Sequence, residues 1–155
     1  MNELVYRNLS EDAKRQICAW KYGGEYDLYN LPSYEEMQVR QIGFMNSQRE
    51  KNYYGFWDES ILVGFVNILE EKEEVFIGIG VNPDLCNKHY GQRMLLITYE
   101  ISKKLYPDKP LYLEVRTWNI RAVKCYQKAG FRIDGQAYEL TTGIGTGTFY
   151  RMIRE

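Results

Sequence analysis

The residues best suited to bind an anion lie in a polar turn over residues 78–91, between a strand pattern and a helical pattern. Backbone N–H groups at a helix N-terminus have no partner within the helix and carry partial positive charge, so they suit a phosphate or pyrophosphate. Lys88 adds a full charge. The single histidine, His89, is either a general base or a solvated side chain, and no second His or Cys stands at a metal-ligand spacing. Judged on these residues alone, a turn that binds no ligand is an alternative interpretation.

A second group of candidates lies in residues 119–131. Asn119 suits the N-cap of a helix, because its side chain can accept a hydrogen bond from the first turn. Ala122 and Tyr126 follow at spacings of three and four residues, which place them on similar faces of that helix. Gly130 suits the C-cap. Core packing would explain the same residues without any ligand.

The elements that must position these residues follow from hydrophobic periodicity, which predicts the order β-α-α-β-β-β-α-β-α-β-β. Ser10 and Ser33 are predicted N-caps, and Glu36 completes a capping box with Ser33. Loops are expected at 21–32, 58–60, 82–87 and, as a Gly/Thr-rich hairpin loop, 141–147. Strands are predicted over 3–9, 52–57, 61–69, 74–81, 111–115, 131–140 and 147–153, and helices over 11–20, 34–45, 90–105 and 119–129.

Composition limits the class of protein. The chain has 155 residues, 45% of them hydrophobic, which predicts one domain over 1–155 with a single core. Its 20 basic and 21 acidic side chains give a formal charge of −1, so neither nucleic acid nor a membrane surface is an expected partner. No signal peptide or membrane-spanning segment is predicted. Three widely spaced cysteines, Cys18, Cys86 and Cys125, indicate reduced thiols and a cytoplasmic location.

The turn over 78–91 resembles the acetyl-CoA loop of GNAT-family N-acetyltransferases, in which V-x-P and two further residues precede R/Q-G-x-G-x-G/A at the start of a helix. The matching positions are Val81, Pro83, Gly91 and the following Met94, Leu95 and Leu96. Cys86 stands where Arg or Gln is common, and Asn87 and His89 replace glycines. Asn tolerates left-handed backbone angles, so Asn87 is the milder change. The resemblance implies acetyl-CoA as co-substrate, held by Cys86, Asn87, Lys88, His89, Tyr90, Gly91 and Gln92.

Residues 119–131 resemble the other GNAT signature, with Asn, then Ala three residues on, Tyr seven on, and Gly-Phe eleven and twelve on. The resemblance implies that Asn119 hydrogen-bonds the pantetheine arm and that Ala122 leaves room for it. It also implies that the phenol of Tyr126 protonates the departing thiolate of CoA, because a phenol and a thiol have similar pKa values.

A GNAT-like fold implies a single mixed, mostly antiparallel sheet of about seven strands with about four helices, splayed between strands four and five. The backbone of Ile79 and Val81 would then contact the acetyl group and the pantetheine. A general base stays unassigned. Candidates are Glu70, Glu74 and Glu114, and a water chain is an alternative. Surface charge beside a turn is the favoured explanation of Glu70 and Glu74.

The resemblance places the acceptor site at the first two helices, their connecting loop and the last hairpin. Tyrosines and carboxylates in that loop suit a cationic amine, through cation–π and charge contacts. The candidate substrate-binding residues are Tyr22, Glu25, Tyr26 and Tyr29, with Asp27 beside them. A tyrosine-rich hydrophobic cover over the core is the alternative.

The expected function is therefore acetyl transfer from acetyl-CoA to the primary amine of a small molecule or peptide, by direct nucleophilic attack. The alternative is a CoA-binding or regulatory protein of the same fold without turnover. A covalent route through Cys125 is not favoured, because no base partner is evident. A homodimer is compatible with the family's fold.

Overall fold

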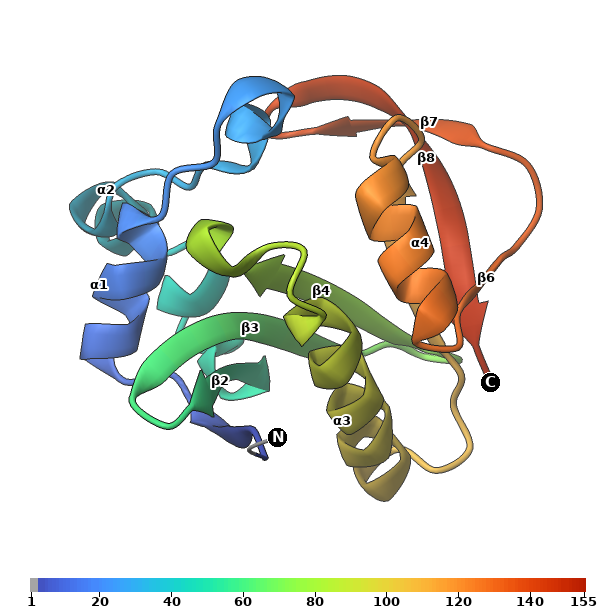
Figure 1. The fold of residues 1–155 in the computed structure, drawn as a ribbon, viewed down its shortest axis with the longest axis horizontal. Helices are drawn as coiled ribbons and strands as arrows, with labels where there is room; N and C mark the ends of the chain where they lie inside the picture. The colour runs from blue at the N-terminus through green and yellow to red at the C-terminus, as the bar shows by residue number, and fades with distance from the viewer. Residues whose placement is uncertain (1–2) are drawn as a thin grey trace. The chain divides into compact units, whose positions relative to one another are not determined.

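The computed structural model describes residues 3–155, which form one eight-stranded sheet and four α-helices (Figure 1). The strands are β1 (Val5–Asn8), β2 (Tyr53–Asp58), β3 (Ile61–Glu70), β4 (Val75–Val81), β5 (Leu111–Arg116), β6 (Arg132–Ile133), β7 (Tyr138–Thr142) and β8 (Gly145–Arg154). The α-helices are α1 (Glu11–Ala19), α2 (Tyr34–Arg40), α3 (Tyr90–Leu105) and α4 (Ile120–Lys128). Short 3₁₀ helices are η1 (Gly24–Tyr29), η2 (Gly43–Met45), η3 (Glu50–Asn52) and η4 (Pro83–Leu85).

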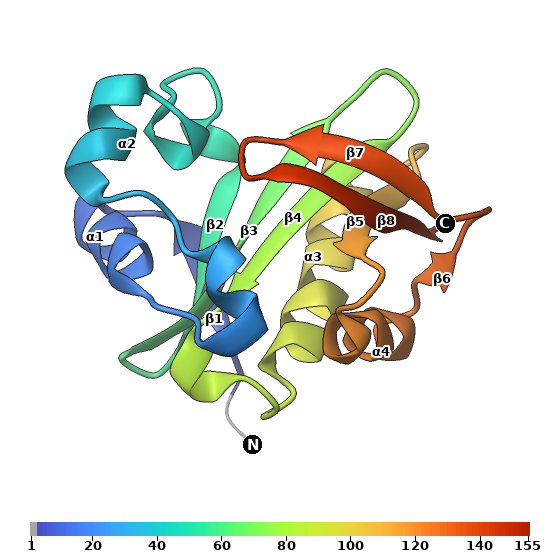
Figure 2. The same cartoon turned by 90° about the horizontal axis from the view of Figure 1, so that it is seen from above.

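The strand order is β1-β2-β3-β4-β5-β8-β6, and β7 pairs with β8 as a long hairpin (Figure 2). β4 runs parallel to β5, whereas β8 is antiparallel to β5, β6 and β7. Pairing of β4 with β5 is confined to Val75–Leu111 and Phe76–Tyr112, as expected for strands that splay beyond that point. The predicted mixed, mostly antiparallel sheet is confirmed.

The chain divides into two compact units, and neither is continuous in sequence. The first contains the residues up to Asn67 together with Ile79–Tyr90. The second contains Ile68–Gly78 and Gly91–Glu155. Among the described residues, no helix is both long enough and apolar enough to span a membrane.

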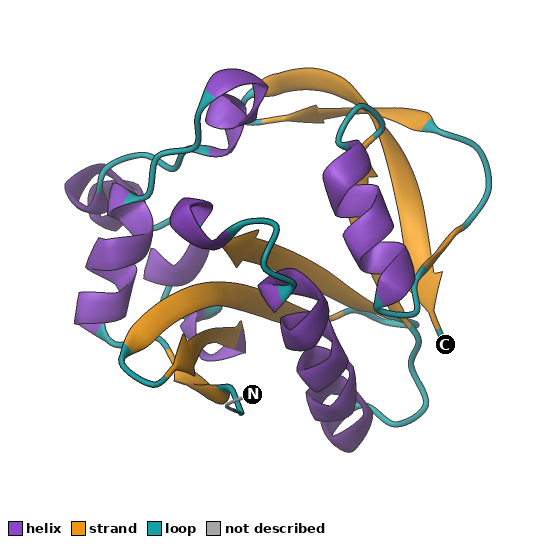
Figure 3. Ribbon diagram, in the orientation of Figure 1, coloured by secondary structure: helices purple, strands orange, loops and turns teal. Residues whose placement is uncertain are grey.

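In the first unit, α1 and α2 lie side by side (Figure 1), and their apolar residues join those of β2 and β3 in one buried cluster. The predicted caps are confirmed, because Ser10 Oγ accepts from Ala13 N and Ser33 Oγ accepts from Glu36 N, both at 3.1 Å. The prediction that the second helix continues to Met45 is wrong. It ends at Arg40, because Gln41 takes a left-handed conformation with φ 53°, and the short helix η2 follows (Figure 3).

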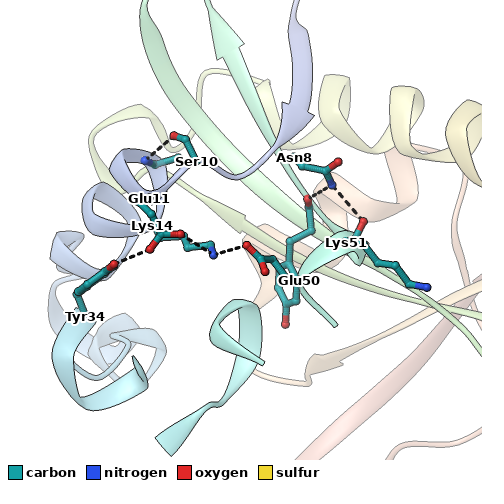
Figure 4. Close-up of polar contacts among 9 residues, drawn as sticks. Asn8, Ser10, Glu11, Lys14, Tyr34, Glu50 and Lys51 are labelled. Atoms are coloured by element: carbon teal, nitrogen blue, oxygen red, sulfur yellow. Dashed lines mark hydrogen bonds and ion pairs between the residues drawn. The ribbon is translucent and has the colours of Figure 1, made fainter. Parts of the chain in front are cut away.

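A buried lysine links α1 to the segment before β2 (Figure 4). Lys14 is only 3% exposed, and its Nζ lies 2.9 Å from Glu11 Oε2 and 2.7 Å from Glu50 Oε1. The hydroxyl of Tyr34, on α2, donates to the other carboxylate oxygen of Glu11. Because a buried ammonium is costly without counter-charges, this cluster fixes the positions of three segments of the first unit.

In the second unit, β5 alternates between two faces. Leu111, Leu113 and Val115 are buried on one face, and Tyr112, Glu114 and Arg116 lie on the other. On β8, Met152 is opposite Leu113 and Arg154 is opposite Leu111, so both share the apolar face. The Arg154 guanidinium donates to the carbonyl oxygen of Ala129 at 2.9 Å, at the C-terminal end of α4. The helix α4 is therefore bound from the apolar face of β5 and β8.

Two predictions for the C-terminal region are wrong. The segment 131–140 does not form one strand, because β6 ends at Ile133 and Gly135, at φ +79°, interrupts the chain before β7. The hairpin loop predicted at 141–147 is also much shorter. The strands continue to Thr142 and resume at Gly145, and Thr141 Oγ1 and Thr146 Oγ1 hydrogen-bond across the hairpin. Threonine favours strands, and this propensity outweighs the turn tendency of the glycines.

Candidate active site

The end of β4 is fixed to β3 by Asn82. Its backbone N–H donates to Val63 O at 2.8 Å, and its Nδ2 donates to Leu62 O at 3.2 Å. Its Oδ1 accepts from Asp84 N at 3.0 Å and so caps η4. One side chain therefore determines both where β4 stops and how the following turn begins, a role that the sequence motif does not reveal.

The turn between η4 and α3 contains two non-glycine residues with left-handed backbone. Asn87 has φ 67° and His89 has φ 66°. For an L-residue this conformation costs roughly 1–2 kcal/mol, least for Asn. These two positions are where the GNAT pattern has glycine, so the backbone keeps the glycine-like path although the side chains differ. Asn87, Lys88 and His89 are exposed, and Cys86 is half-buried.

The turn leads directly into α3, which begins at Tyr90. The hydroxyl of Tyr90 donates to Asp58 Oδ2 at 2.6 Å, at the end of β2. Gly91 is buried and Gln92 is half-buried. The N–H groups in the first turn of α3 have no acceptor inside the helix, so this is an electropositive helix start beside a left-handed turn. That combination suits a phosphate group.

The loop after α1 is tied to the end of β4. The hydroxyl of Tyr22 donates to Val81 O at 2.6 Å, and the backbone N–H of Tyr22 donates to Asn30 Oδ1, also at 2.6 Å. The first bond joins Tyr22, which was predicted to bind the acceptor, to Val81, which was predicted to bind the acetyl group, and both lie in the first unit. The second bond closes the loop at its base.

The rest of that loop is the 3₁₀ helix η1, where an irregular loop was expected. Glu25 and Asp27 are exposed, whereas Tyr26 and Tyr29 are half-buried. The two carboxylates are therefore available to a cation, and the two phenols contribute a partly apolar surface next to them.

An aromatic cluster lies beside β4, and sequence reasoning missed it. Phe65 is stacked on Tyr53 with ring centroids 6.4 Å apart, and Phe44 and Trp20 contact the same ring. A Cβ on Gly80 would overlap the Phe65 ring, so only glycine fits there. Gly80 in this strand therefore marks a close aromatic contact.

In the second unit, Asn119 caps α4 as predicted. Its Oδ1 accepts from Ala122 N at 3.2 Å, and the residue is only 7% exposed. Ala122 and Tyr126 are half-buried on the helix that follows. Gly130 ends the helix at φ +97°. The sequence therefore predicted this helix, its caps and its spacing correctly.

The candidate general bases are held by other side chains. Glu74 binds Arg151 in a bidentate pair, with N–O distances of 2.9 and 2.6 Å. Glu114 Oε2 accepts from the hydroxyl of Tyr138 at 2.7 Å, and Glu70 pairs with Lys109. Burial and the hydrogen bond to Glu114 raise the pKa of Tyr138 above its usual range. All three candidate carboxylates are therefore already engaged by other side chains.

The cysteines show no sign of a thiolate nucleophile. All three are free thiols, and burial raises the pKa of Cys125 and of Cys18. No group of three or more His, Cys, Asp or Glu residues within 3–155 is arranged to hold a metal ion.

A sequence model of the acetyltransferase (GNAT) family matches residues 10–131, which include both the left-handed turn and the capped helix α4. The chain belongs to the acetyltransferase (GNAT) family. As a GNAT member it is an acyl-CoA-dependent N-acetyltransferase. Over 104 residues this acetyltransferase is 29% identical to the probable spermine N(1)-acetyltransferase of Bacillus subtilis subsp. natto (strain BEST195), covering 59% of this chain and 68% of the relative.

Solved structures share the GNAT fold at low sequence identity. A spermidine N-acetyltransferase SpeG chimera from Vibrio cholerae and hSSAT has a TM-score of 0.78 at 19% identity, covering 99% of this chain and 95% of that one. A GNAT-family acetyltransferase from Bacillus anthracis has a TM-score of 0.77 at 18% identity, covering 98% and 94%. AAC(6')-Ib in complex with ribostamycin and coenzyme A has a TM-score of 0.73 at 16% identity, covering 99% and 93%.

Proposed function

We propose that this GNAT chain transfers an acetyl group from acetyl-CoA to a primary amine, with residues 1–155 acting as one catalytic domain. The observation that carries the proposal is the left-handed backbone of Asn87 and His89. Two strained residues at successive glycine positions of the family pattern preserve a backbone path whose use is to bring amides close to a pyrophosphate. The family match, which spans both units, supports a single catalytic domain.

The residues present fit acetyl-CoA. The left-handed turn and the start of α3 supply amides for the pyrophosphate, and the exposed Lys88 supplies a positive charge. Asn119 and Ala122 would contact the pantetheine, and the backbone of Ile79 and Val81 would contact the acetyl group. The proposed cofactor residues are Ile79, Val81, Cys86, Asn87, Lys88, His89, Tyr90, Gly91, Gln92, Asn119, Ala122 and Tyr126.

The proposed reaction is direct attack of a neutral amine nitrogen on the thioester carbonyl carbon. A C–N bond forms, the C–S bond breaks, and the hydroxyl of Tyr126 donates its proton to the departing sulfur. The amine loses one proton in the same sequence. Because Glu74 and Glu114 are bound by Arg151 and Tyr138, that proton is assigned to water.

The acceptor is proposed to enter beside the loop that contains Tyr22, Glu25, Tyr26 and Tyr29. Exposed carboxylates and half-buried phenols there suit an ammonium group. The bond from Tyr22 to Val81 supports the placement, because it holds this loop against the strand end proposed to bind the acetyl group. The relatives named as spermine and spermidine acetyltransferases, and the aminoglycoside complex, are consistent with an amine acceptor.

The test pairs calorimetry with acetylation assays on a panel of amines. Wild-type protein should bind acetyl-CoA at micromolar concentration and acetylate at least one amine. Tyr126→Phe should lower kcat by about 10²- to 10⁴-fold, because the general acid is lost, with the KM for acetyl-CoA little changed. Tyr106→Phe, which removes another half-buried phenol of the second unit, is the matched control and should keep full activity.

Two results would contradict the proposal. Absence of acetyl-CoA binding at millimolar concentration would show that the altered turn does not accept the cofactor. Binding without acetylation of any amine would favour a regulatory CoA-binding protein instead.

A further inference from the structure

The turn proposed to bind the pyrophosphate, residues 86–89 (the cofactor turn), is held from the β2–β3 hairpin on both sides. Before the turn, Asn82 Nδ2 donates to Leu62 O, near the start of β3. After the turn, the hydroxyl of Tyr90 donates to Asp58 Oδ2, on the last residue of β2, at 2.6 Å. All of these residues belong to the first unit, so the whole arrangement lies within one compact body.

The β2–β3 hairpin is a firm support for these bonds. Asp58 pairs with Ile61 and Trp57 pairs with Leu62, so only residues 59 and 60 connect the two strands. The side chains of Trp57 and Leu62 are buried in the cluster that α1 and α2 share with the sheet. Because hydrogen-bonded strands with buried side chains move less than an exposed loop, Asp58 presents its carboxylate from a well-fixed position.

The cofactor turn needs such support because its backbone is strained. Asn87 and His89 have φ angles of 67° and 66°. Non-glycine residues disfavour this left-handed region, so they stay in it only where the surrounding structure imposes it. The side chains of Asn87, Lys88 and His89 are exposed and contribute little packing. The flanking residues must therefore supply the constraint, and Asn82 and Tyr90 have the hydrogen bonds to do so.

The bond from Tyr90 to Asp58 is well suited to this role. A hydrogen bond to a carboxylate is stronger than one between neutral groups, and 2.6 Å is a short distance between two oxygen atoms. Both residues are half-buried, which lessens competition from water. The bond spans 32 residues of sequence, so it fixes the end of the cofactor turn to a separate part of the chain.

We propose that Asp58 is a positioning residue for acetyl-CoA, because it holds the cofactor turn, through Tyr90, in the left-handed form that presents amides to the pyrophosphate. This inference rests on the proposed acetyltransferase function and adds a residue outside both GNAT-like motifs. Asp58 acts through Tyr90 and not on the reacting atoms. Its loss should therefore weaken acetyl-CoA binding, since a smaller fraction of the protein has the binding-competent turn, and should leave the transfer step unchanged.

The first experiment measures acetyl-CoA binding by calorimetry in wild type, Asp58→Ala, Tyr90→Phe and the double variant. Each single variant should raise the Kd by about 10-fold, the scale of one hydrogen bond to a charged group. The double variant should bind no more weakly than either single variant, because both changes remove the same bond. Asp58→Asn keeps an oxygen that can accept from the phenol, so it should lose less affinity.

A smaller acetyl donor separates an effect on the turn from general damage to the enzyme. S-acetylpantetheine lacks the pyrophosphate, so its kcat/KM should be the same in wild type, Asp58→Ala and Tyr90→Phe. With acetyl-CoA, the same variants should raise KM and keep kcat. Adding His89→Gly to Tyr90→Phe should recover part of the affinity for acetyl-CoA, because glycine adopts a positive φ without strain.

Tyr99→Phe is the matched control, because it removes another phenol hydrogen bond from α3, the one to Glu155 O, and should bind acetyl-CoA as wild type does. Unchanged acetyl-CoA affinity in Asp58→Ala and Tyr90→Phe would overturn the inference and leave the acetyltransferase function standing. Equal losses with acetyl-CoA and with S-acetylpantetheine would also overturn it, because the damage would not be confined to the turn. Failure of wild type to bind acetyl-CoA would instead overturn the proposed function itself.

Discussion

Lys14 shows how a single buried charge depends on its partners. Burial lowers the pKa of Lys14, but the hydrogen bonds to Glu50 and Glu11 outweigh it and raise the pKa above the usual value of a lysine. The charged form is therefore favoured by folding. Its contribution to stability is complete below the pKa of the unfolded chain and is lost as pH rises through the folded pKa.

Replacing both carboxylates, in Glu11→Gln/Glu50→Gln, should destabilise the fold by about 2–4 kcal/mol, because a buried ammonium loses its counter-charges. Only burial then acts on Lys14, so its folded pKa falls below the unfolded value. The unfolding free energy of this variant should therefore rise as pH increases toward the usual lysine pKa, opposite to wild type. Urea denaturation at several pH values measures both effects.

Adding Lys14→Met to that pair should recover most of the lost stability, because the unpaired charge is gone. Glu36→Gln is the control, since its pair with Arg40 is long, at 3.9 Å, and exposed on both sides. A pH-independent loss in the double variant would mean that Lys14 is already neutral in the fold.

At the scale of single residues, the sequence predicted part of the candidate site. The spacing of Asn119, Ala122 and Tyr126 is local, so it could be predicted from a helical repeat. The pair of Glu74 with Arg151 could not be predicted, because it depends on the position of β8 beside β5 in the sheet. Glu74 and Arg151 are 77 residues apart in the chain, and no local pattern connects them.

At the scale of elements, capped helices were predicted most accurately. Ser10, Ser33 and Asn119 each accept the expected backbone hydrogen bond, and each lies next to the helix it begins. The errors lie where a helix or strand ends without such a residue. The helix α2 stops at a left-handed Gln41, a residue type with no tendency to end helices.

The cap of α4 can be separated from its proposed role in cofactor binding. Asn119→Ala removes both the oxygen that caps the helix and the amide, so it should lose about 1 kcal/mol of stability and weaken acetyl-CoA binding. Asn119→Asp keeps an oxygen at the N-terminus, so it should keep the stability but still bind acetyl-CoA less tightly. Chemical denaturation measures the stability and calorimetry measures the acetyl-CoA affinity of the same samples. Equal acetyl-CoA affinity in all three proteins would restrict Asn119 to a capping role.

At the scale of the whole molecule, the two compact units share one interrupted chain. The boundaries between them fall at 67–68, 78–79 and 90–91, so no single cut separates one unit from the other. Neither unit is therefore a contiguous folding segment, and we expect one cooperative unfolding transition.

Acetyl-CoA should raise the temperature of that transition. A ligand that binds only the folded state at one hundred times its Kd contributes about 2.7 kcal/mol, which corresponds to roughly 5–10 °C for a chain of this size. Differential scanning calorimetry with increasing acetyl-CoA measures the shift, and adenosine alone is the control ligand. Two resolved transitions, only one of which responds to acetyl-CoA, would contradict a single cooperative domain.

The loop closed by Tyr22 and Asn30 has a consequence for how this enzyme could acquire new specificities. The loop is held at its two ends, because Tyr22 donates hydrogen bonds both to Asn30 and to Val81, the last residue of β4. Between those ends, the carboxylates of Glu25 and Asp27 are exposed, so their charges can change while the ends keep their geometry. Under the proposed function, selection at these two positions could favour a new acceptor without first requiring compensation elsewhere in the fold.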